Sequence, residues 1–377
     1  MPSTKQADLA GPGIGTYEEV ERILPTDYRA LLDPKETQFA IHALKRFIED
    51  NLCKELNLFH VEVPLIVSRE SGVNDYLDRD GSRTPIEFPC GLGLERPIQG
   101  QVVQAATKWK RMALAQFGCT PGEGICTDMR AVRKDYFLDH DHSAYVDQWD
   151  WERVITSRER TLDYLKDTVR RIWKVIKGAE TFILREFPKL ETPKVPRLPD
   201  ELTFLHAEDL LDLYPDLPRK QRETRVLSEK FPAVFILGIG WVLKDGFPHE
   251  MRAADYDDWA TPTKSADGRP MHGLNGDILV WNPVTKRRHE LTSMGIRVTK
   301  ETLRTQLELS KQLDLLKLPY HQAILNDRIP LSIGGGIGQS RTVMLLLRKA
   351  HLGEVSVTVW PKRLNEICEK KNIRVLE

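Results

Sequence analysis

The stretch SIGGGIGQSRTVMLLL, residues 332–347, joins a glycine-rich apolar segment to a helical pattern. It has no P-loop lysine, and Gln339 or Arg341 stands where a dinucleotide fingerprint needs its last glycine. The pattern therefore predicts a strand that runs through glycines into a helix N-terminus. The glycines would let a ligand ring lie against the backbone, while the helix dipole and Arg341 face an anion. A tight strand–helix turn with a surface arginine fits the stretch equally well.

A second segment, residues 122–154, predicts a strand that ends at Arg133, a charged loop and a returning strand. Alternation along the returning strand separates polar from aromatic side chains, with Gln148, Asp150 and Glu152 on one face and Trp149 and Trp151 on the other. Gln148 and Asp150 are then about 7 Å apart, a spacing suited to an ammonium group beside a carboxamide or carboxylate. An edge strand with solvated polar residues fits the same pattern.

Two further strands are predicted at 274–282 and 288–298, which places Asp277 and Glu290 on neighbouring strands. Two carboxylates in such positions can bridge Mg²⁺ ions to a triphosphate. Surface carboxylates that face an arginine are an equally good interpretation. Strict alternation puts Ser293 and Arg297 on the opposite face from Glu290, so a common pocket would require a β-bulge near Ser293.

The rest of the chain reads as a mixture of helices and strands. Asp33 and Pro34 open a capped helix, and the alternating segment 58–67 predicts a strand whose Pro64 belongs at an edge, a bulge or an interface. A long helix is predicted over 157–187. Because no regular βαβ order appears, the pattern favours an α+β fold with an antiparallel sheet.

Two segments have the composition of an extension or a linker. Residues 1–32 are polar and are punctuated by glycine and proline, which predicts a flexible or loosely docked extension. The proline-rich stretch 187–199 is the best candidate for an internal linker.

Composition narrows the possible functions. The 377 residues hold 55 basic and 55 acidic side chains, and a formal charge of zero disfavours nucleic acid or anionic lipid as a bulk partner. The five cysteines form no C-x-x-C pair, which argues against zinc ribbons and thioredoxin motifs. No apolar run is long enough to span a membrane, and the first residues resemble no signal peptide. We therefore expect a soluble cytoplasmic protein.

In this order, the segments resemble motifs 1, 2 and 3 of class II aminoacyl-tRNA synthetases, at residues 33–67, 122–154 and 331–347. Six strings are more closely similar to signatures of the asparagine synthetase A family, the aspartate–ammonia ligases: KWKR at 108–111, YVDQWDWERV at 145–154, DYDDW at 255–259, LNGDILVWNP at 274–283, ELTSMGIR at 290–297 and IGGGIGQSR at 333–341. The resemblance implies one catalytic domain over 33–377, with a class II synthetase-like antiparallel sheet flanked by helices, and a homodimer.

The same resemblance implies an activity. It is ATP-dependent synthesis of L-asparagine from L-aspartate and ammonia through a β-aspartyl-adenylate, with release of AMP and pyrophosphate. ATP would act with Mg²⁺, and no prosthetic group is expected. A carboxylate does not react with ammonia until it is activated, so acyl-adenylate chemistry with charge-stabilising arginines and Mg²⁺ suits this reaction.

Site residues are implied by the matching positions. Asp75, Arg133, Gln148 and Arg341 would be the catalytic residues. The nucleotide would be held by Arg133, Asp277, Glu290, Gly336 and Arg341, with Mg²⁺ at Asp277 and Glu290. The amino acid would be bound by Lys110, Gln148, Asp150, Asp257, Ser293 and Arg297. Asp75 would face the side-chain carboxyl and could take a proton from ammonium.

One departure from the family stands just before the KWKR string. The family usually has His-Ser-Leu-Ala, whereas this chain has Gln104, Ala105, Ala106 and Thr107. A substrate contact made by that serine hydroxyl would be lost or replaced, with Gln104 as the candidate replacement.

Three alternatives to the ligase fit the sequence less well. An aspartyl- or asparaginyl-tRNA synthetase needs an anticodon-binding module, and residues 1–32 are too short for an OB barrel. A non-catalytic, synthetase-like binding protein would be expected to lose Arg133, Arg341 or the Asp277 and Glu290 pair. A glutamine-dependent synthetase would need an N-terminal nucleophile, whereas this chain opens with Met1 and Pro2.

Overall fold

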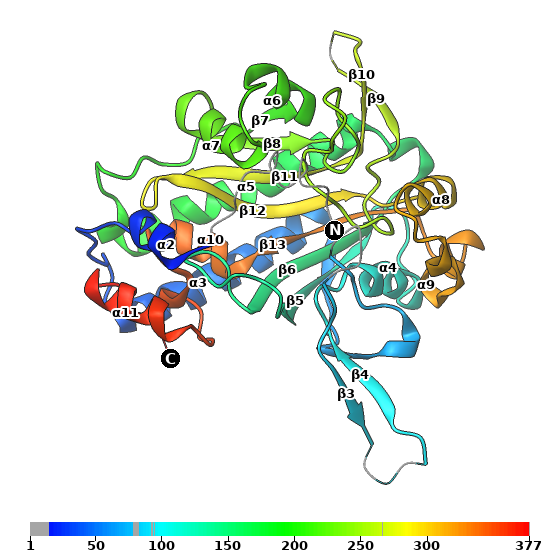
Figure 1. The fold of residues 1–377 in the computed structure, drawn as a ribbon, viewed down its shortest axis with the longest axis horizontal. Coiled ribbons are helices and arrows are strands. Elements are labelled where there is room, and N and C mark those ends of the chain that lie inside the picture. The colour runs from blue at the N-terminus through cyan, green and yellow to red at the C-terminus, as the bar shows by residue number, and fades with distance from the viewer. Residues whose placement is uncertain (1–14, 78–82, 92, 94, 266, 377) are drawn as a thin grey trace.

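The computed structural model describes residues 15–77, 83–91, 93, 95–265 and 267–376. Its centre is one eight-stranded sheet (Figure 1). In spatial order the strands are β1 (Leu58–His60), β5 (Gly124–Val132), β6 (Tyr145–Val154), β13 (Ser332–Gly338), β12 (Arg287–Ile296), β11 (Asn275–Asn282), β8 (Ala233–Leu237) and β7 (Thr203–His206). The outer pairs, β1 with β5 and β7 with β8, are parallel, and the remaining pairs are antiparallel. The predicted α+β class with an antiparallel sheet is confirmed.

One face of this sheet is apolar and carries the main core. Helices α3 (Pro34–Leu56), α5 (Leu162–Glu186) and α10 (Gln339–Leu346) pack on it. Trp149 and Trp151 point into this core and are fully buried, which confirms the predicted alternation along β6. These helices therefore fix which face of each central strand points away from the core.

The opposite face is divided between two kinds of cover. Helices α6 (Ala207–Leu213) and α7 (Arg219–Glu229) pack on Val234, Ile236 and Leu279 at the β8 and β11 end. At the other end α4 (Thr107–Gln116) packs against β6 and β13. Helices α8 (Lys300–Leu309) and α9 (Pro319–Leu325) lie near α4 (Figure 1). Polar side chains of β6, β11 and β12 occupy this face between the two covers.

The predicted strand 58–67 is divided in the structure. Its first part is β1 of the large sheet, and its last part begins β2 (Ile66–Ser68) of a separate sheet with β4 (Ile98–Val102) and β3 (Glu87–Cys90). Pro64 lies in the break, because proline has no N–H to donate to a ladder. The β3 and β4 hairpin projects from the body, and β9 (Pro262–Lys264) and β10 (Pro270–His272) form another small hairpin (Figure 1).

Both ends of the described chain pack together. Asp33 caps α3 through the Glu36 N–H, with Pro34 at the first helical position, as predicted. Before it lies α2 (Tyr17–Ile23), and Val20 and Leu24 are buried in a cluster with Leu364 and Ile367 of α11 (Lys362–Lys370). Residues 15–32, predicted to be flexible or loosely docked, therefore include a helix that packs on α11. Residues 1–14 lie outside the described residues.

The proline-rich stretch 187–199 is not a linker, which corrects that prediction. It contains the short 3-10 helix η3 (Pro188–Leu190), and Leu190 and Leu198 are buried in the main core. The Leu198 N–H donates to the Glu180 carboxylate of α5. This stretch packs along α5 and does not separate two units. In the described part of the chain, no helix has the length and apolar character needed to cross a membrane.

Candidate active site

The glycines of β13 make room for side chains of the neighbouring strand β6. A Cβ atom at Gly334 would lie 1.9 Å from Glu152 Oε2, and one at Gly336 would lie 2.7 Å from Gln148 Oε1. On the apolar face, a Cβ atom at Gly335 would lie 2.3 Å from Met294 Cβ. Alanine at Gly334 or Gly335 would collide with fixed atoms, whereas at Gly336 it would meet the end of the flexible Gln148 side chain. The glycine run thus leaves room for the polar side chains of β6.

A β-bulge in β12 gathers the remaining polar residues on this face. Ile278 pairs with Thr292 and Leu279 pairs with Glu290, which leaves Leu291 as the extra residue. The extra residue shifts the alternation by one position, so Glu290 lies on the same face as the following polar residues, Ser293 and Arg297. The bulge that a common pocket requires is therefore present, two residues before Ser293.

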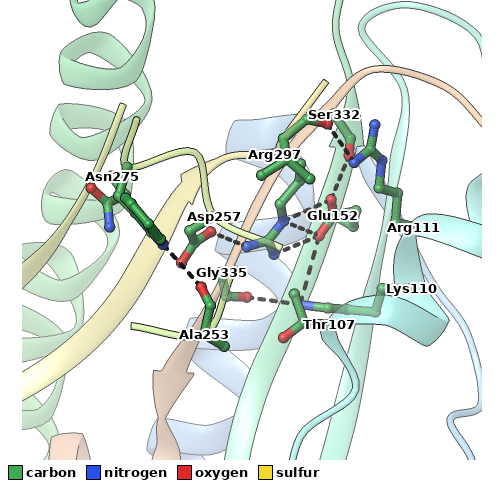
Figure 2. A network of polar contacts seen from close by, with 12 residues as sticks. Thr107, Lys110, Arg111, Glu152, Ala253, Asp257, Asn275, Arg297, Ser332 and Gly335 are labelled. Carbon is green, nitrogen blue, oxygen red and sulfur yellow. Dashed lines mark hydrogen bonds and ion pairs between the residues drawn. The ribbon is translucent and has the colours of Figure 1, made fainter. Parts of the chain in front are cut away.

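Five buried, charged side chains form what we call the inner network: Lys110, Asp150, Glu152, Asp257 and Arg297. Figure 2 shows all of these except Asp150 under their labels. Arg297 binds Glu152 in a bidentate manner, with Nε 3.0 Å from Oε1 and Nη2 2.7 Å from Oε2, and also bonds to Asp257. Lys110 bonds to Asp150 and to the backbone carbonyls of Trp151 and Gly335 at 2.9 and 3.1 Å. Ser332 donates to Glu152 Oε1 at 2.6 Å. Charged side chains from four separate segments of the chain thus pair with one another in this network.

The pKa values of the carboxyl groups in the inner network are shifted in different directions. Burial raises the pKa of Asp150 and of Asp257 above the usual aspartate range. Burial also acts to raise the pKa of Glu152, but the charge of Arg297 and its hydrogen bonds hold that pKa below its ordinary value. Among the described residues, Asp150 Oδ2 is buried without a hydrogen-bond partner. A buried carboxylate oxygen of this kind suits the ammonium group of a ligand.

Asp277 lies beside the inner network, opposite Ser293 in the ladder between β11 and β12. Its Oδ2 bonds to Arg252, a residue that the sequence analysis missed because it belongs to no recognisable string. Burial, and less strongly the charge of Glu290, raises the pKa of Asp277 to about 7. Within the described chain, Oδ1 has no hydrogen-bond partner. The adjacent strands bring Asp277 and Glu290 into one electrostatic environment, as predicted.

The second region, here called the outer end, consists of Arg133, Gln148, Glu290 and Arg341. All four are partly exposed, with Arg341 and Glu290 side chains 24% and 28% accessible. Arg341 makes long contacts: Nε is 3.2 Å from the Asp141 carbonyl, and Nη1 is 3.8 Å from Glu290 Oε1. Arg133 donates from Nε to the Gln104 carbonyl at 3.0 Å. Cationic groups that are so loosely held can reorient toward an anionic ligand.

Asp75 is fully buried and has a structural partner that the sequence did not reveal. Its carboxylate accepts from the N–H groups of Thr107 at 2.7 Å and Lys108 at 3.4 Å, so it caps the N-terminus of α4. Burial raises its pKa to about 6, against the lowering effect of the Lys108 charge. Asp150 acts on it electrostatically, which places Asp75 near the inner network.

Behind Asp75 lies a buried chain of three charged or polar side chains. Lys108 Nζ is 2.7 Å from Asp255 Oδ2, and the same oxygen is 3.0 Å from His321 Nε2. Lys108 and Asp255 belong to the KWKR and DYDDW strings, but nothing in the sequence pointed to a role for either, and no signal marked His321. Only tertiary structure brings α4, the 255–259 loop and α9 together here.

The position that departs from the family pattern is occupied by a structural side chain. Gln104 is buried, and its Nε2 donates to the backbone carbonyls of Asp75 and Arg83, both at 3.2 Å. Its backbone N–H donates to Asn74 Oδ1. Gln104 therefore holds the loop that carries Asp75, and its amide nitrogen is already engaged there.

Residues 35–372 match the sequence profile of the family described as aspartate-ammonia ligase. The chain is 45% identical over 355 residues to the aspartate--ammonia ligase of Bacteroides fragilis, covering 94% of this chain and 99% of that protein. It is 45% identical over 353 residues to that of Clostridium perfringens, covering 94% and 98%. Among solved structures, asparaginyl-tRNA synthetase from Pyrococcus horikoshii with asparaginyl-adenylate superposes with a TM-score of 0.60 at 13% identity, covering 85% and 68%.

Proposed function

We propose, on the premise that the chain belongs to the aspartate–ammonia ligase family, that it makes L-asparagine from L-aspartate, ammonia and ATP. The observation that carries this proposal is the 45% identity that extends over 99% of a named ligase. The class II synthetase fold, supported by the structural neighbours, fits an adenylate-forming enzyme. In the first step the aspartate side-chain carboxylate attacks the α-phosphorus, and pyrophosphate leaves. In the second, ammonia attacks the acyl carbon, and AMP leaves.

The inner network is our candidate for the amino-acid site. Asp150 Oδ2 supplies a buried acceptor for the α-ammonium group, and Gln148 stands two residues away on the same face. Lys110 and Arg297 are the cations available to the two carboxylates of aspartate, with Asp257 orienting Arg297 and Ser293 adding a hydroxyl. Because their charges are already paired, the site is organised before the substrate arrives.

The outer end is our candidate for the triphosphate site. Arg133 and Arg341 would clamp the phosphates, and Gly336 would leave the backbone accessible to the nucleotide. Negative charge builds on the α-phosphate oxygens during attack by a carboxylate. Guanidinium groups positioned at those oxygens stabilise the transition state more than the ground state. Support comes from the partial exposure and long contacts of Arg341.

Asp277 and Glu290 fit a Mg²⁺ site by their chemistry. Asp277 offers an oxygen that lacks a hydrogen-bond partner among the described residues. Its raised pKa means that the anionic form of the carboxyl is destabilised, and a bound cation would stabilise that form. Glu290 adds a partly exposed carboxylate on the same face. When bound with ATP, Mg²⁺ supplies charge neutralisation at the phosphates. The carboxylates of this chain would hold and orient that ion.

Asp75 is our candidate for the ammonia step. Ammonium has no lone pair, so a carboxylate must bind the cation and take one proton before the nitrogen attacks the acyl carbon. A carboxylate with a pKa of about 6 is ionised at neutral pH and is more basic than ordinary aspartate. Its two backbone N–H bonds fix its position at the N-terminus of α4.

A homodimer is part of the proposal. Apolar side chains stand exposed on and beside β1, β2 and β4, including Phe59, Leu65, Ile66 and Ile98, each about half accessible. Clustered exposed apolar residues are typical of interfaces, and most soluble oligomers are symmetric pairs of one chain. Light scattering should give twice the chain mass, and Ile66→Asp should shift it toward the monomer.

The five free thiols support a cytoplasmic location, since disulfides are rare in reducing compartments.

The function is tested by incubating purified protein with ATP, Mg²⁺, aspartate and ammonium and separating the nucleotides. We expect AMP and asparagine in equal amounts, both dependent on aspartate. Aspartate-dependent ADP would overturn the adenylate mechanism. Absence of nucleotide turnover would favour a non-catalytic binding protein. Aminoacylation of added tRNA would favour an aspartyl- or asparaginyl-tRNA synthetase.

A further inference from the structure

The loop between β5 and β6 contains a cluster of ionisable side chains that the proposed reaction does not use. Asp139, His140 and Asp141, here called the loop cluster, each offer one ligand atom, and these atoms all lie within 4.8 Å of one another. Asp139 and His140 are 2% exposed, and the Asp141 side chain is 12% exposed. Two carboxylates so far from water are unfavourable without partners. Asp139 accepts backbone N–H bonds from Asp141 and His142, and the His142 ring contacts both carboxylates.

His140 points into the loop cluster without completing a hydrogen bond there. Its Nδ1 lies 3.7 Å from Asp139 Oδ1 and 4.0 Å from Asp141 Oδ1, both beyond hydrogen-bond distance. In the part of the chain that the structure describes, this buried nitrogen has no hydrogen-bond partner. A buried ring nitrogen between two carboxylates, at distances too long for hydrogen bonds, leaves space for an ion bound by all three.

A fourth side chain reaches the loop cluster from β12. His289 is 1% exposed, and its Nε2 is 2.9 Å from the Arg341 carbonyl, which can only accept. Nε2 therefore carries the hydrogen, and in the neutral ring Nδ1 keeps its lone pair. That Nδ1 lies 3.8 Å from Asp141 Oδ2. Two lone pairs that face each other repel, whereas ligands of a tetrahedral zinc ion are about 3.4 Å apart.

The ring of His289 also has the outer contact that metal-binding histidines usually have. Such a histidine donates its second ring N–H to a carboxylate or backbone carbonyl, which fixes the ring and its tautomer. The bond from Nε2 to the Arg341 carbonyl supplies this contact. The donor set of two imidazoles and two carboxylates suits Zn²⁺, Co²⁺ or Ni²⁺, since Mg²⁺ prefers oxygen ligands alone.

We propose that the loop cluster and His289 together bind one divalent transition-metal ion. The ion joins the β5–β6 loop to β12 and, through the Arg341 carbonyl, to the first turn of α10. His142, whose Nδ1 is 2.8 Å from Asp141 Oδ1 and 3.1 Å from Asp139 Oδ1, holds the carboxylates in the absence of metal and gives up these contacts when the metal enters. The site uses none of the residues proposed to hold Mg²⁺.

The test uses the full chain, stripped of metal with a chelator and titrated with Co²⁺ alone. We expect one equivalent to bind with the visible absorption of histidine-ligated Co²⁺ in a low-coordination site. A large excess of Mg²⁺ should leave this absorption in place, and Zn²⁺ should abolish it. Absence of the absorption in the wild-type chain overturns the proposal, as does its displacement by Mg²⁺.

Two variants locate the ion. His140→Ala and His289→Ala should each weaken Co²⁺ binding at least about tenfold, the lower bound for losing even an outer-shell partner. The matched control is His42→Ala, which removes an exposed histidine on α3 and should bind like the wild type. Circular dichroism checks that each variant folds. If His289→Ala does not fold, His289→Gln is used in its place. Unchanged affinity in folded loop-cluster and His289 variants overturns the assignment.

Discussion

The inner network and the outer end lie on the same face of one sheet, yet they are built in opposite ways. In the inner network Arg297 is 2% exposed and makes short, bidentate bonds to Glu152. At the outer end Arg341 is 24% exposed, and its nearest carboxylate contact is 3.8 Å long. One arginine is fixed by protein carboxylates, whereas the other retains much of its freedom.

This difference teaches how a single face can serve two ligands. A small amino acid offers few atoms for recognition, so its site benefits from charges that are fixed in advance. A triphosphate brings its own charges, so its site needs cations that become fully engaged only when the phosphates bind. Substitutions in the two regions should therefore have different effects. Those in the inner network should mainly lower the free energy of unfolding, whereas those at the outer end should mainly lower the reaction rate.

The largest effect is expected for Arg297→Met. It leaves Glu152 and Asp257 as buried carboxylates without their cation, and breaking a buried pair in this way costs about 3–5 kcal/mol of unfolding free energy. Urea denaturation measures this loss. The control Arg185→Met removes an exposed arginine of α5 and should change stability by less than about 0.5 kcal/mol. Equal stability of the two variants would contradict the view that the inner network is a closed ion-pair system.

Arg341→Ala should instead lower the rate by about 10²-fold or more, with little change in stability. The removed guanidinium is partly exposed, so the protein loses few contacts, while the transition state loses a phosphate clamp. Steady-state AMP release gives the rate, and Arg341→Lys should recover part of it because the charge returns without the fork geometry. Near-normal rates in Arg341→Ala would remove this residue from the site.

Acid pH should affect the ammonia step through Asp75. The carboxylate form takes the proton, and a pKa of about 6 means that this form predominates above pH 6 and is lost as the pH falls below it. At saturating Mg²⁺ and ATP, kcat/KM for ammonium, calculated from the NH₄⁺ concentration, should fall about tenfold per pH unit below 6. In Asp75→Asn this acid limb should be absent. An identical limb in both proteins would assign it to another group.

The smallest effect is expected from a matched pair of glycine variants. In Gly336→Ala the new Cβ meets only the flexible end of Gln148, so the side chain moves and the proposed amino-acid contact weakens. Loss of one net hydrogen bond of about 1 kcal/mol raises KM for aspartate about fivefold. In Gly335→Ala the Cβ meets the Met294 Cβ and the Ser293 carbonyl, and overpacking should cost about 1–3 kcal/mol of stability instead. A KM effect in Gly335→Ala alone would reverse the assignment of the two faces.

The sequence predicted most of the sheet and the strands that carry the candidate site residues. Alternation placed Trp149 and Trp151 in the core correctly, and the two carboxylate-bearing strands are neighbours as expected. These predictions succeed because side-chain alternation and capping are local properties of the backbone. The conditional β-bulge also follows locally, since Glu290 and Ser293 cannot otherwise share a face.

The misses come from contacts between distant segments. Arg252 meets Asp277 across 25 positions, and His321 meets Asp255 across 66. No spacing rule connects such pairs. The packing of α2 depends on a partner helix near the other end of the chain, which polarity and glycine content alone do not reveal. Pro64 signalled an edge or a break, but only the register shows that the chain changes sheets there.

The extra residue at Leu291 has a consequence for the shape of β12. Deletion of that one residue would place Glu290 and Ser293 two positions apart, so both would stay on one face of a regularly alternating strand. A bulge bends its strand and increases the local twist, so the shortened strand would be straighter. Glu290 would then point in a different direction relative to Ser293 and Arg297, although all three would remain on the same side of the sheet.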